Sequence, residues 1–448
     1  MNAAPIIHDF LCYNIGMETN YAEPLEMALA GWRLELLRLL AYQSAMSRMP
    51  LYLVGGVVRD ILLERTINDF DLVLVGDSAV FAKYVMQKYG GNVRLYPKFG
   101  TATWVVNEST FNRLNIVTHP DSALSFDIVS ARSEIYAQPG SLPIVRRATI
   151  DEDLRRRDFT INAMAIRLDG SYFGKLTDPL NGRKDLENKL VRVLHSRSFV
   201  EDPTRMFRAV RYAARYGFEI EPETLSLIND EARGVMAQLS GERLRHELDL
   251  VFEEAQAGAM LKNLKELGLL NEIHPALQIG DNGWLSALTD KPEEVFAEFS
   301  LPGILSFKQV LGWVLYLMNL SASDIEAVAH RLTFPTVLTK TVTGASALNS
   351  GLVSAKDWKP SQWTFYLDQF PPLAVYAVYL VKFWSDLQDY FMIWRHIKPF
   401  TTGYTLQQLG LEPGPRFAEI LRQLRTAWLD GEVATEDEEK KLLEELIR

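Results

Sequence analysis

Two aspartates one residue apart are the first residues in the chain whose types and spacing could do chemistry. Asp69 and Asp71 stand at the start of the apolar run Leu72–Val75, which is typical of a buried strand. Residues i and i+2 of a strand share a face, so both carboxylates are expected on one side of a sheet. Carboxylate oxygens are the ligands that Mg²⁺ prefers. The pair therefore predicts a Mg²⁺ site that could bridge to a nucleoside triphosphate.

A glycine pair precedes these aspartates. Leu51–Val54 reads as a short buried strand, Gly55 and Gly56 permit a tight turn, and Val57–Leu63 begins a helix. A turn of this kind before a helix can cradle a phosphate. By itself such a turn is more often a plain chain reversal, and an Asp-x-Asp is more often turn chemistry. Their occurrence together favours a site for phosphates and metal.

Arginines in two later segments could bind an anion. Arg155, Arg156 and Arg157 run directly into an apolar segment, where a guanidinium can fork onto phosphate oxygens. In the second segment, Asp202 is a suitable N-cap, Pro203 stands at the first helical position, and Gly217 ends the helix. One face of this helix is lined by four arginines, namely Arg205, Arg208, Arg211 and Arg215. A solvated face with an ordinary Asp202–Arg205 pair is the plainer interpretation, but four arginines without an acid suit a docked anion.

These motifs carry a family resemblance. The order of strand, Gly-Gly turn, helix with Arg59-Asp60 and Asp-x-Asp resembles the head of the nucleotidyltransferase superfamily. With the block Arg156–Ala163, it is similar to the class II branch of CCA-adding tRNA nucleotidyltransferases and bacterial poly(A) polymerases. The resemblance is strong over about residues 50–270 and weak over 400–440.

The resemblance implies roles for individual residues. Catalytic carboxylates would be Asp69, Asp71 and Asp127, the first two holding Mg²⁺ and the third accepting the proton of the primer 3′-hydroxyl. Asp202 and Arg205 would read the base, and Asp158 and Asn162 would organise the pocket. Nucleotide binding by the turn and the arginines would involve Gly55, Gly56, Arg59, Arg157, Arg208 and Arg211.

The function implied is template-independent addition of CCA to tRNA 3′ ends from CTP and ATP, with pyrophosphate release. The tRNA would be held at its acceptor stem and elbow. An A-adding enzyme acting after a separate CC-adding partner would carry the same motifs. The length of residues 132–153 argues against a CC-only enzyme, and the acidic end Glu436–Glu439 against a poly(A) polymerase. A catalytically silent RNA-binding or scaffold protein is disfavoured because the carboxylates and arginines are present.

The elements that position these residues follow from hydrophobic periodicity. Strands and helices alternate from Leu51 to about Val129, with a helix at Ala79–Tyr89 and strands at Thr101–Val106 and Ser125–Val129. Pro24–Met46 reads as one amphipathic helix, residues 132–153 as a mobile loop, and the chain from Glu223 onward as helical.

The expected fold is an elongated multidomain protein. An α/β nucleotidyltransferase head on a mixed sheet would precede all-α neck, body and tail domains. The boundaries expected are 1–48 for an N-terminal extension and helix, 49–185 for the catalytic head, 186–272 for a helical neck with the nucleotide-selecting motif, 273–395 for a helical body and 396–448 for a tRNA-binding helical tail.

The composition bears on the kind of partner and on the cellular location that can be expected. The net charge is −10, yet net charge does not locate a patch, and an acidic protein can bind RNA through one basic cleft. The single cysteine, Cys12, excludes an intrachain disulfide and fits a reducing cytoplasm. No apolar run is long enough to span a membrane, and no secretory signal is recognisable.

Overall fold

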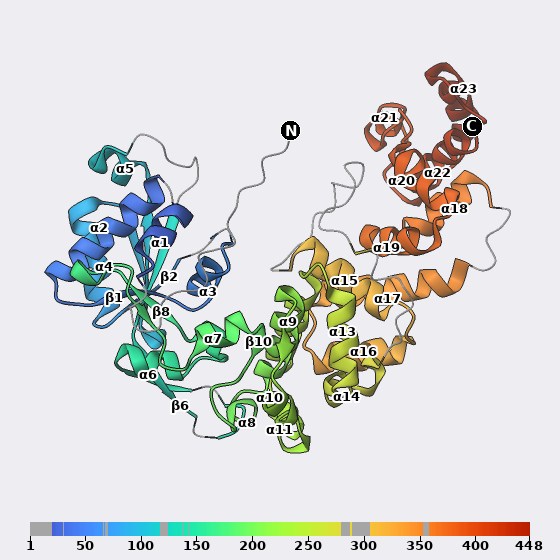
Figure 1. Ribbon diagram of the computed structural model, residues 1–448. Helices are drawn as coiled ribbons and strands as arrows, with labels where there is room; N and C mark the ends of the chain where they lie inside the picture. Colours follow the sequence, from blue (N-terminus) through green and yellow to red (C-terminus); the bar gives the residue numbers. More distant parts are fainter. Residues whose placement is uncertain are drawn as a thin grey trace, which may run out of the picture. The chain divides into compact units, whose positions relative to one another are not determined.

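The computed structural model describes residues 20–29, 31–65, 67, 70–116, 124–136, 138–141, 143–278, 287–288, 305–352 and 358–448. The chain divides into two compact units, Met1–Val235 and Met236–Arg448. In Figure 1 the first unit runs from blue to green and the second from yellow to red. The five-part division expected from the sequence is finer and stays a prediction.

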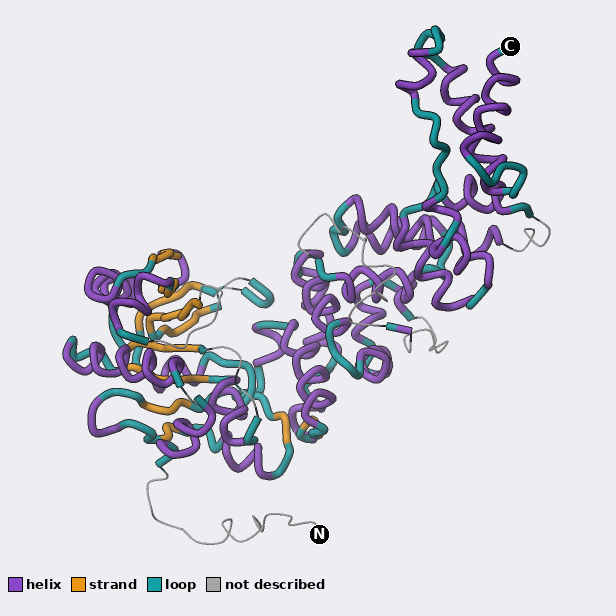
Figure 2. The backbone as a smooth tube through the Cα atoms, turned by 90° about the horizontal axis from the view of Figure 1, so that it is seen from above, coloured by secondary structure: helices purple, strands orange, loops and turns teal. Residues whose placement is uncertain are grey.

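A seven-stranded sheet forms the centre of the first unit. Its strands are β1 (Leu51–Val54), β2 (Asp71–Leu74), β3 (Asn92–Tyr96), β4 (Thr101–Val106), β5 (Leu124–Ser130), β8 (Ala165–Arg167) and β9 (Leu176–Thr177). The strand order is β3-β4-β5-β2-β1-β8-β9, and the strands lie side by side in Figure 2. The pairing of β2 with β5 is parallel, whereas the other neighbours in this sheet pair antiparallel. The predicted mixed sheet is confirmed.

Both faces of the central strands are covered, which explains why all four residues of β1 are buried. Helices α2 (Trp32–Met46) and α4 (Ser78–Tyr89) pack against the sheet. The Asp77 side chain caps α4 by accepting from the amides of Ala79 and Val80. On one face of the sheet, an apolar cluster joins Tyr52, Val54 and Val73 to Leu154 of α6 (Ile150–Arg155). Asp71 precedes Val73 by two residues in the same strand, so its carboxylate lies on the face of the sheet that carries this cluster.

Two predicted elements differ from the structure. The helix expected over Pro24–Met46 is wrong, because it is divided into α1 (Ala22–Ala28) and α2, with Gly31 at φ +71° between them. The mobile loop expected over residues 132–153 is also wrong. It contains the antiparallel pair β6 (Arg132–Ile135) and β7 (Ile144–Arg147), and α6 begins within its last four residues. Leucine spacing continues across Gly31, and cross-strand pairing is non-local, which explains both errors.

The helices that carry the remaining motifs begin and end near the predicted residues. Helix α9 extends over Thr204–Tyr216 and ends at Gly217, whose φ of +66° is left-handed. The helix begins one residue later than predicted, with Pro203 rather than Asp202 at the N-cap, and the Asp202 carboxylate accepts from the amide and hydroxyl of Thr204. The other regular elements of this unit are α3 (Gly56–Leu62), α5 (Glu108–Leu114), α7 (Gly182–Glu187), β10 (Leu190–Val191), α8 (Ser198–Glu201), β11 (Glu219–Ile220), α10 (Pro222–Ser226) and α11 (Asp230–Val235).

The second unit is helical throughout its described residues (Figure 2). Its α-helices are α12 (Gly241–Phe252), α13 (Ala257–Glu266), α14 (Leu269–Ile273), α15 (Phe307–Leu317), α16 (Ala322–Arg331), α17 (Thr336–Gly351), α18 (Pro360–Leu367), α19 (Pro372–Lys382), α20 (Ser385–Met392), α21 (Gly403–Gln408), α22 (Pro415–Leu429) and α23 (Glu436–Ile447). Glu439 of α23 is 1% exposed and accepts from the amides of Phe400 and Thr401 and from the Trp428 indole. These bonds fasten the last helix to the segment before α21 and to α22.

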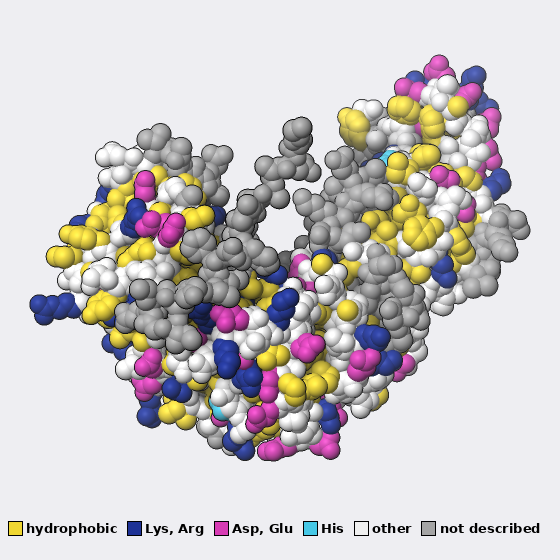
Figure 3. Space-filling model, in the orientation of Figure 1, with side chains coloured by type: hydrophobic (Ala, Val, Ile, Leu, Met, Phe, Trp, Pro, Cys, Tyr) yellow, Lys and Arg dark blue, Asp and Glu magenta, His cyan; other side chains and the backbone are white. Residues whose placement is uncertain are grey.

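Charged side chains of both signs are interspersed over the face shown in Figure 3. The negative net charge is therefore not gathered into one patch on that face. Among the described helices, none combines the length and the apolar character needed to cross a membrane.

Candidate active site

Two of the three predicted carboxylates are neighbours on the sheet. The parallel register of β2 and β5 places Asp71 opposite Asp127, so both side chains project from the same face. Thr103 of β4 is opposite Asp127 on its other side and donates its hydroxyl to the carboxylate at 2.5 Å. Asp69 lies outside the described residues. The chain thus brings together two acids that are distant in sequence.

The donor set of Asp71 and Asp127 fits a hard divalent cation. Both are exposed carboxylates at strand positions, and oxygen ligands from carboxylates are those that Mg²⁺ takes. No group of three or more His, Cys, Asp or Glu side chains forms a complete cage within the described part of the chain. A two-carboxylate site leaves coordination positions for substrate oxygens, which is the arrangement used in phosphoryl transfer.

A cavity of about 360 Å³ opens beside Asp71. Six arginines and four carboxylates line it, which makes it locally basic in an acidic protein. The charged residues are Arg59, Arg156, Arg157, Arg205, Arg208, Arg215, Asp71, Glu134, Asp158 and Asp202. A surplus of guanidinium groups in a concave site suits a multiply charged anion.

A chain of buried polar contacts joins the glycine turn to α9 through Asn162. The Arg59 guanidinium donates to Asn162 Oδ1 at 2.5 Å, and the Asn162 amide donates to Asp158 at 3.0 Å. Arg208 completes the chain by donating to Asp158 Oδ2 through Nε at 2.8 Å and Nη2 at 2.5 Å. Burial of Asp158 opposes its ionisation, but the charge of Arg208 and these hydrogen bonds outweigh it and hold its pKa below the ordinary value.

Arg59 is more buried, and has more protein contacts, than its predicted role in binding a triphosphate suggests. It is 4% exposed, forks onto Asp60 through Nε and Nη2, and lies 4.4 Å from the centre of the Tyr216 ring. The Tyr216 hydroxyl donates to the same Asp60. Contact between Arg59 and a triphosphate stays a prediction. What the geometry shows is a guanidinium that ties α3 to α9.

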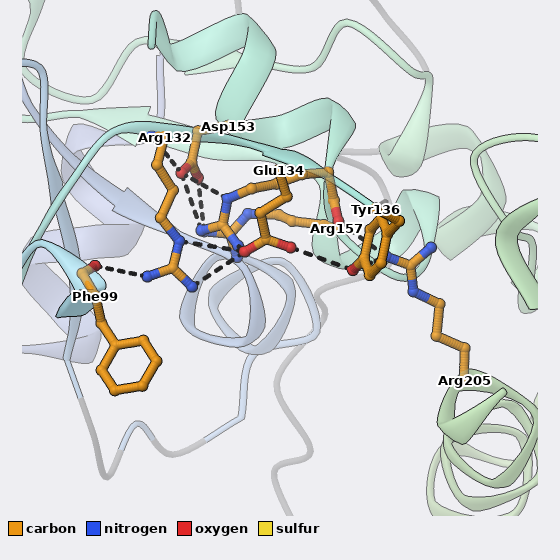
Figure 4. Close-up of polar contacts among 8 residues, drawn as sticks. Phe99, Arg132, Glu134, Tyr136, Asp153, Arg157 and Arg205 are labelled. Atoms are coloured by element: carbon orange, nitrogen blue, oxygen red, sulfur yellow. Dashed lines mark hydrogen bonds and ion pairs between the residues drawn. The ribbon is translucent and has the colours of Figure 1, made fainter. Parts of the chain in front are cut away.

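A second polar network lies on the hairpin side of the cavity (Figure 4). The fully buried Asp153 accepts from the Arg132 amide at 3.1 Å, from Arg156 at 2.9 Å and from Arg157 at 3.1 Å. Glu134 binds Arg132 at 3.1 Å and Arg156 at 2.9 Å. Arg157, the predicted nucleotide ligand, is therefore anchored by one nitrogen at the edge of the cavity.

Tyr136 and Arg205 link this network to α9. The Tyr136 hydroxyl donates to Glu134, and Arg205 reaches Tyr136 at 3.5 Å and the carbonyl of Arg156 at 3.1 Å. Arg205 also donates to the buried Ser198 hydroxyl at 2.7 Å. Burial raises the pKa of Tyr136 to about 12, so its hydroxyl keeps its proton. Asp202 and Arg205, predicted to read the base, both line the cavity.

The four arginines of α9 do not form the uniform exposed strip that the sequence indicates. Arg205 and Arg211 are each 5% exposed, and Arg208 is paired with Asp158. Arg208 and Arg215 line the cavity, whereas Arg211 does not. A role for Arg211 in nucleotide binding stays a prediction.

The glycine turn permits a close approach of side chains to the backbone. Gly55 has φ +70°, and a Cβ there would lie 2.5 Å from Arg157 Nη1. A Cβ on Gly56, which lines the cavity, would lie 3.3 Å from Arg59 Nη2. Both glycines therefore make room for the arginines, and their contact with phosphate stays a prediction.

Several lining residues were not predicted. Glu134 and Tyr136 belong to the hairpin segment interpreted as a loop, and Tyr212 of α9 had no expected role. Arg156 and Arg215 stand in the arginine motifs, so their spacing carried a signal. For Glu134 and Tyr136 no local signal was available, because the residues of β6 do not alternate between polar and apolar.

Comparison with known proteins shows which family the chain belongs to. Residues 51–192 match the poly A polymerase head domain, and residues 217–279 match the probable RNA and SrmB-binding site of polymerase A. An A-adding tRNA nucleotidyltransferase of Halalkalibacterium halodurans is 34% identical, over 90% of this chain and 90% of its own. The chain belongs to the tRNA nucleotidyltransferase and poly(A) polymerase family. Membership in this enzyme class confirms the resemblance read from the motifs.

Further family members agree in sequence and in fold. An A-adding tRNA nucleotidyltransferase of Geobacter sulfurreducens is 34% identical over 88% of this chain, which spans 45% of that longer protein. The apo form II of a CCA-adding enzyme superposes with a TM-score of 0.76 at 26% identity, covering 96% of this chain and 98% of its own. A Thermotoga maritima CCA-adding enzyme solved with tRNA gives 0.70 at 25% identity, covering 96% and 98%. The predicted head with a helical remainder is thus confirmed.

Proposed function

We propose that this nucleotidyltransferase transfers AMP from ATP to the 3′ end of a tRNA that already ends in CC. The observation that carries this specificity is the match to an A-adding enzyme over nine-tenths of both chains. By contrast, a CCA-adding enzyme of Geobacillus is 29% identical over 68% of each chain. The proposal implies a separate CC-adding enzyme as a functional partner, and the expected cytoplasmic location stays a prediction.

In the proposed reaction the primer 3′-oxygen attacks the α-phosphorus of ATP. A phosphorus–oxygen bond to the primer forms, the bond to the β-phosphate oxygen breaks, and pyrophosphate leaves with that electron pair. Asp71 and Asp127, with Asp69, would hold Mg²⁺, which lowers the pKa of the primer hydroxyl and neutralises pyrophosphate when bound. Asp127 would take the hydroxyl proton. The adjacent register of Asp71 and Asp127 supports this assignment.

The basic cavity would hold the nucleotide. Arg157 and Arg208 are each anchored by a buried aspartate, so their guanidinium groups are oriented before substrate arrives. Asp202 and Arg205 would face the base, because a carboxylate and a guanidinium together offer the acceptors and donors that a Watson–Crick edge requires. Support comes from the presence of all four in one cavity.

Full CCA addition is the second candidate, and it is the function the motifs imply most directly. The structural match to CCA-adding enzymes over 96% of the chain favours it. The chain resembles A-adding relatives in sequence and CCA-adding enzymes in fold, so tests with defined substrates must decide which base is added.

The test uses three tRNA transcripts that end before CCA, after C and after CC, each with labelled CTP or ATP and Mg²⁺. We expect AMP incorporation only into the transcript ending in CC. Extension of all three to CCA would establish full CCA addition instead, and a long A tail would indicate a poly(A) polymerase. Failure to extend any transcript would refute nucleotidyl transfer.

Matched variants tie the activity to the carboxylates. Asp71→Asn and Asp127→Asn are each expected to reduce incorporation by more than about a thousandfold, since a charged group acting on the reacting atoms is lost. Glu187→Gln removes an exposed carboxylate paired with Arg183 in the same unit and should leave the activity unchanged. Wild-type activity in Asp71→Asn would contradict the assignment.

A further inference from the structure

Three cavities of the first unit are joined end to end. The nucleotide cavity shares Asp71, Arg156 and Arg157 with a second cavity of about 480 Å³. The second cavity shares Phe99, Thr101 and Arg132 with a third of about 300 Å³. The three therefore form a row along the sheet face that carries the carboxylates.

Asp71 lies where the nucleotide cavity and the second cavity meet, and nucleotidyl transfer would occur there. Nucleotidyl transfer brings two substrates to the same carboxylates, and Asp71 faces a cavity on each side. The second cavity has Thr101 and Val129 in its wall. They are register partners in β4 and β5, on the face that also carries Asp127. A nucleotide seated in the second cavity would thus present its end to both acids.

Phe99 stands between the second and third cavities and lines both. Phe99 is 51% exposed, and Tyr96 in the second cavity is 47% exposed. Arg132 fixes the Phe99 backbone by donating to its carbonyl at 2.8 Å. In Figure 4 the ring extends away from the polar network that holds Arg132. A fixed backbone with an exposed ring is suited to stack on a planar group.

The charge of the two cavities fits a strand with a phosphate backbone. Their charged lining consists of four guanidinium groups, from Arg132, Arg147, Arg156 and Arg157, against the carboxylates of Asp71 and Asp77. Aromatic rings interleaved with arginines are the usual means of holding single-stranded nucleic acid. Each cavity has the volume of a small-ligand site.

We propose that the second and third cavities bind the last and the penultimate nucleotide of the RNA primer, with Phe99 stacking on a base at their boundary. The inference rests on the proposed function and adds a primer-positioning residue to it. Because two subsites precede the nucleotide cavity, the enzyme would sense two nucleotides of the primer end before it adds another.

The test compares steady-state constants for a tRNA ending in CC. Phe99→Ala is expected to raise the KM for tRNA about tenfold, equal to about 1.4 kcal/mol, and to leave the KM for ATP within about twofold. Base–aromatic stacking of this size is common in single-strand binding. Phe99→Trp should retain the wild-type KM, because a larger ring still stacks.

The matched control is Tyr172→Ala. Tyr172 is a similarly exposed aromatic residue of the same unit, at 46%, and lines none of the three cavities. Its ring centre lies 3.9 Å from Arg167 Cζ, so the variant also removes a ring that contacts an arginine. Its KM for tRNA should stay within about twofold of wild type.

A direct readout places pyrrolocytidine at the last or the penultimate primer position, since stacking quenches this cytidine analogue. Wild-type enzyme should quench it on binding, and Phe99→Ala should quench it less. Undiminished quenching and an unchanged KM for tRNA in Phe99→Ala would overturn the inference. That result is distinct from failure of the proposed function, in which the wild-type enzyme itself would extend no transcript.

Discussion

Replacing Asp158 by Asn tests the buried polar chain that joins the head to α9. The substitution keeps the shape of the side chain and an oxygen for the Phe159 amide, which donates to Asp158 at 2.8 Å. It removes the charge that receives two nitrogens of Arg208. An amide nitrogen would then face a guanidinium across a buried contact.

The expected loss follows from the burial of the two partners. Asp158 is 7% exposed, but the Arg208 side chain is 35% exposed and can regain water. Removing one partner of a fully buried pair costs about 3–5 kcal/mol. Rehydration of Arg208 reduces this, so we expect local opening of α9 to become easier by about 2–3 kcal/mol.

The pH dependence has a definite sign. The pKa of folded Asp158 is lowered from its ordinary value of 3.8. Its stabilising effect is therefore fully present above pH 3.8 and is lost as the pH falls through the lower, folded pKa. The difference between wild type and Asp158→Asn should stay constant from pH 7 to about pH 4.5 and shrink only below pH 3.8.

Hydrogen exchange read by mass spectrometry is the suitable assay, because it reports the amides of α9 separately from those of residues 236–448. Glu187→Gln, in an exposed pair with Arg183, is the control and should change exchange by no more than about 0.5 kcal/mol. A difference that already shrinks between pH 6 and pH 5 would show that burial dominates the pKa of Asp158. Such a result would refute the stabilising role assigned to the Arg208 charge.

Three further outcomes are expected. In thermal unfolding, Gly55→Ala should lower the free energy of unfolding by about 3 kcal/mol, since φ is +70° and the added Cβ would meet Arg157. Gly217→Ala, at a left-handed φ in open space, should lower it by about 1 kcal/mol in the same measurement. Glu439→Gln should weaken protection of α23 in hydrogen exchange by about 2 kcal/mol, because an amide nitrogen then replaces either the oxygen that accepts from the Thr401 amide and hydroxyl or the oxygen that accepts from the Phe400 amide and the Trp428 indole. Removal of divalent ions with EDTA should abolish AMP incorporation and added Mg²⁺ should restore it, whereas activity in excess EDTA would exclude a metal role for Asp71 and Asp127.

Local patterns predicted the elements whose residues carry their own signal. Strand β4 has the bounds expected from its apolar alternation, and α4 begins one residue early because Asp77 caps it. The pocket residues Asp158 and Asn162 were predicted from the family resemblance of their motif. They are hydrogen-bonded to each other, and their role in the pocket stays a prediction.

Residues whose partners are distant in sequence were harder to interpret. Arg59 meets Asn162 across 103 positions, and nothing in its own motif indicates that it would be buried there. Arg208 looked unpaired on its helix because its partner, Asp158, comes from another segment 50 residues away. Periodicity describes one element at a time, so it leaves such pairings undetermined.

The parallel pairing of β2 with β5 also bears on how this enzyme can change over evolution. After Leu74 the chain builds α4, adds β3 and β4 to the same sheet, forms α5, and returns beside β2 at Leu124 in a register that sets Asp71 against Asp127. Insertions and deletions in the loops between β2 and β5 leave the two acids adjacent, since hydrogen bonds between these two strands fix the spacing of the acids. A deletion of one residue within β2 or β5 would turn one acid to the opposite face. The loops between β2 and β5 should therefore tolerate changes in length, whereas the two strands should not.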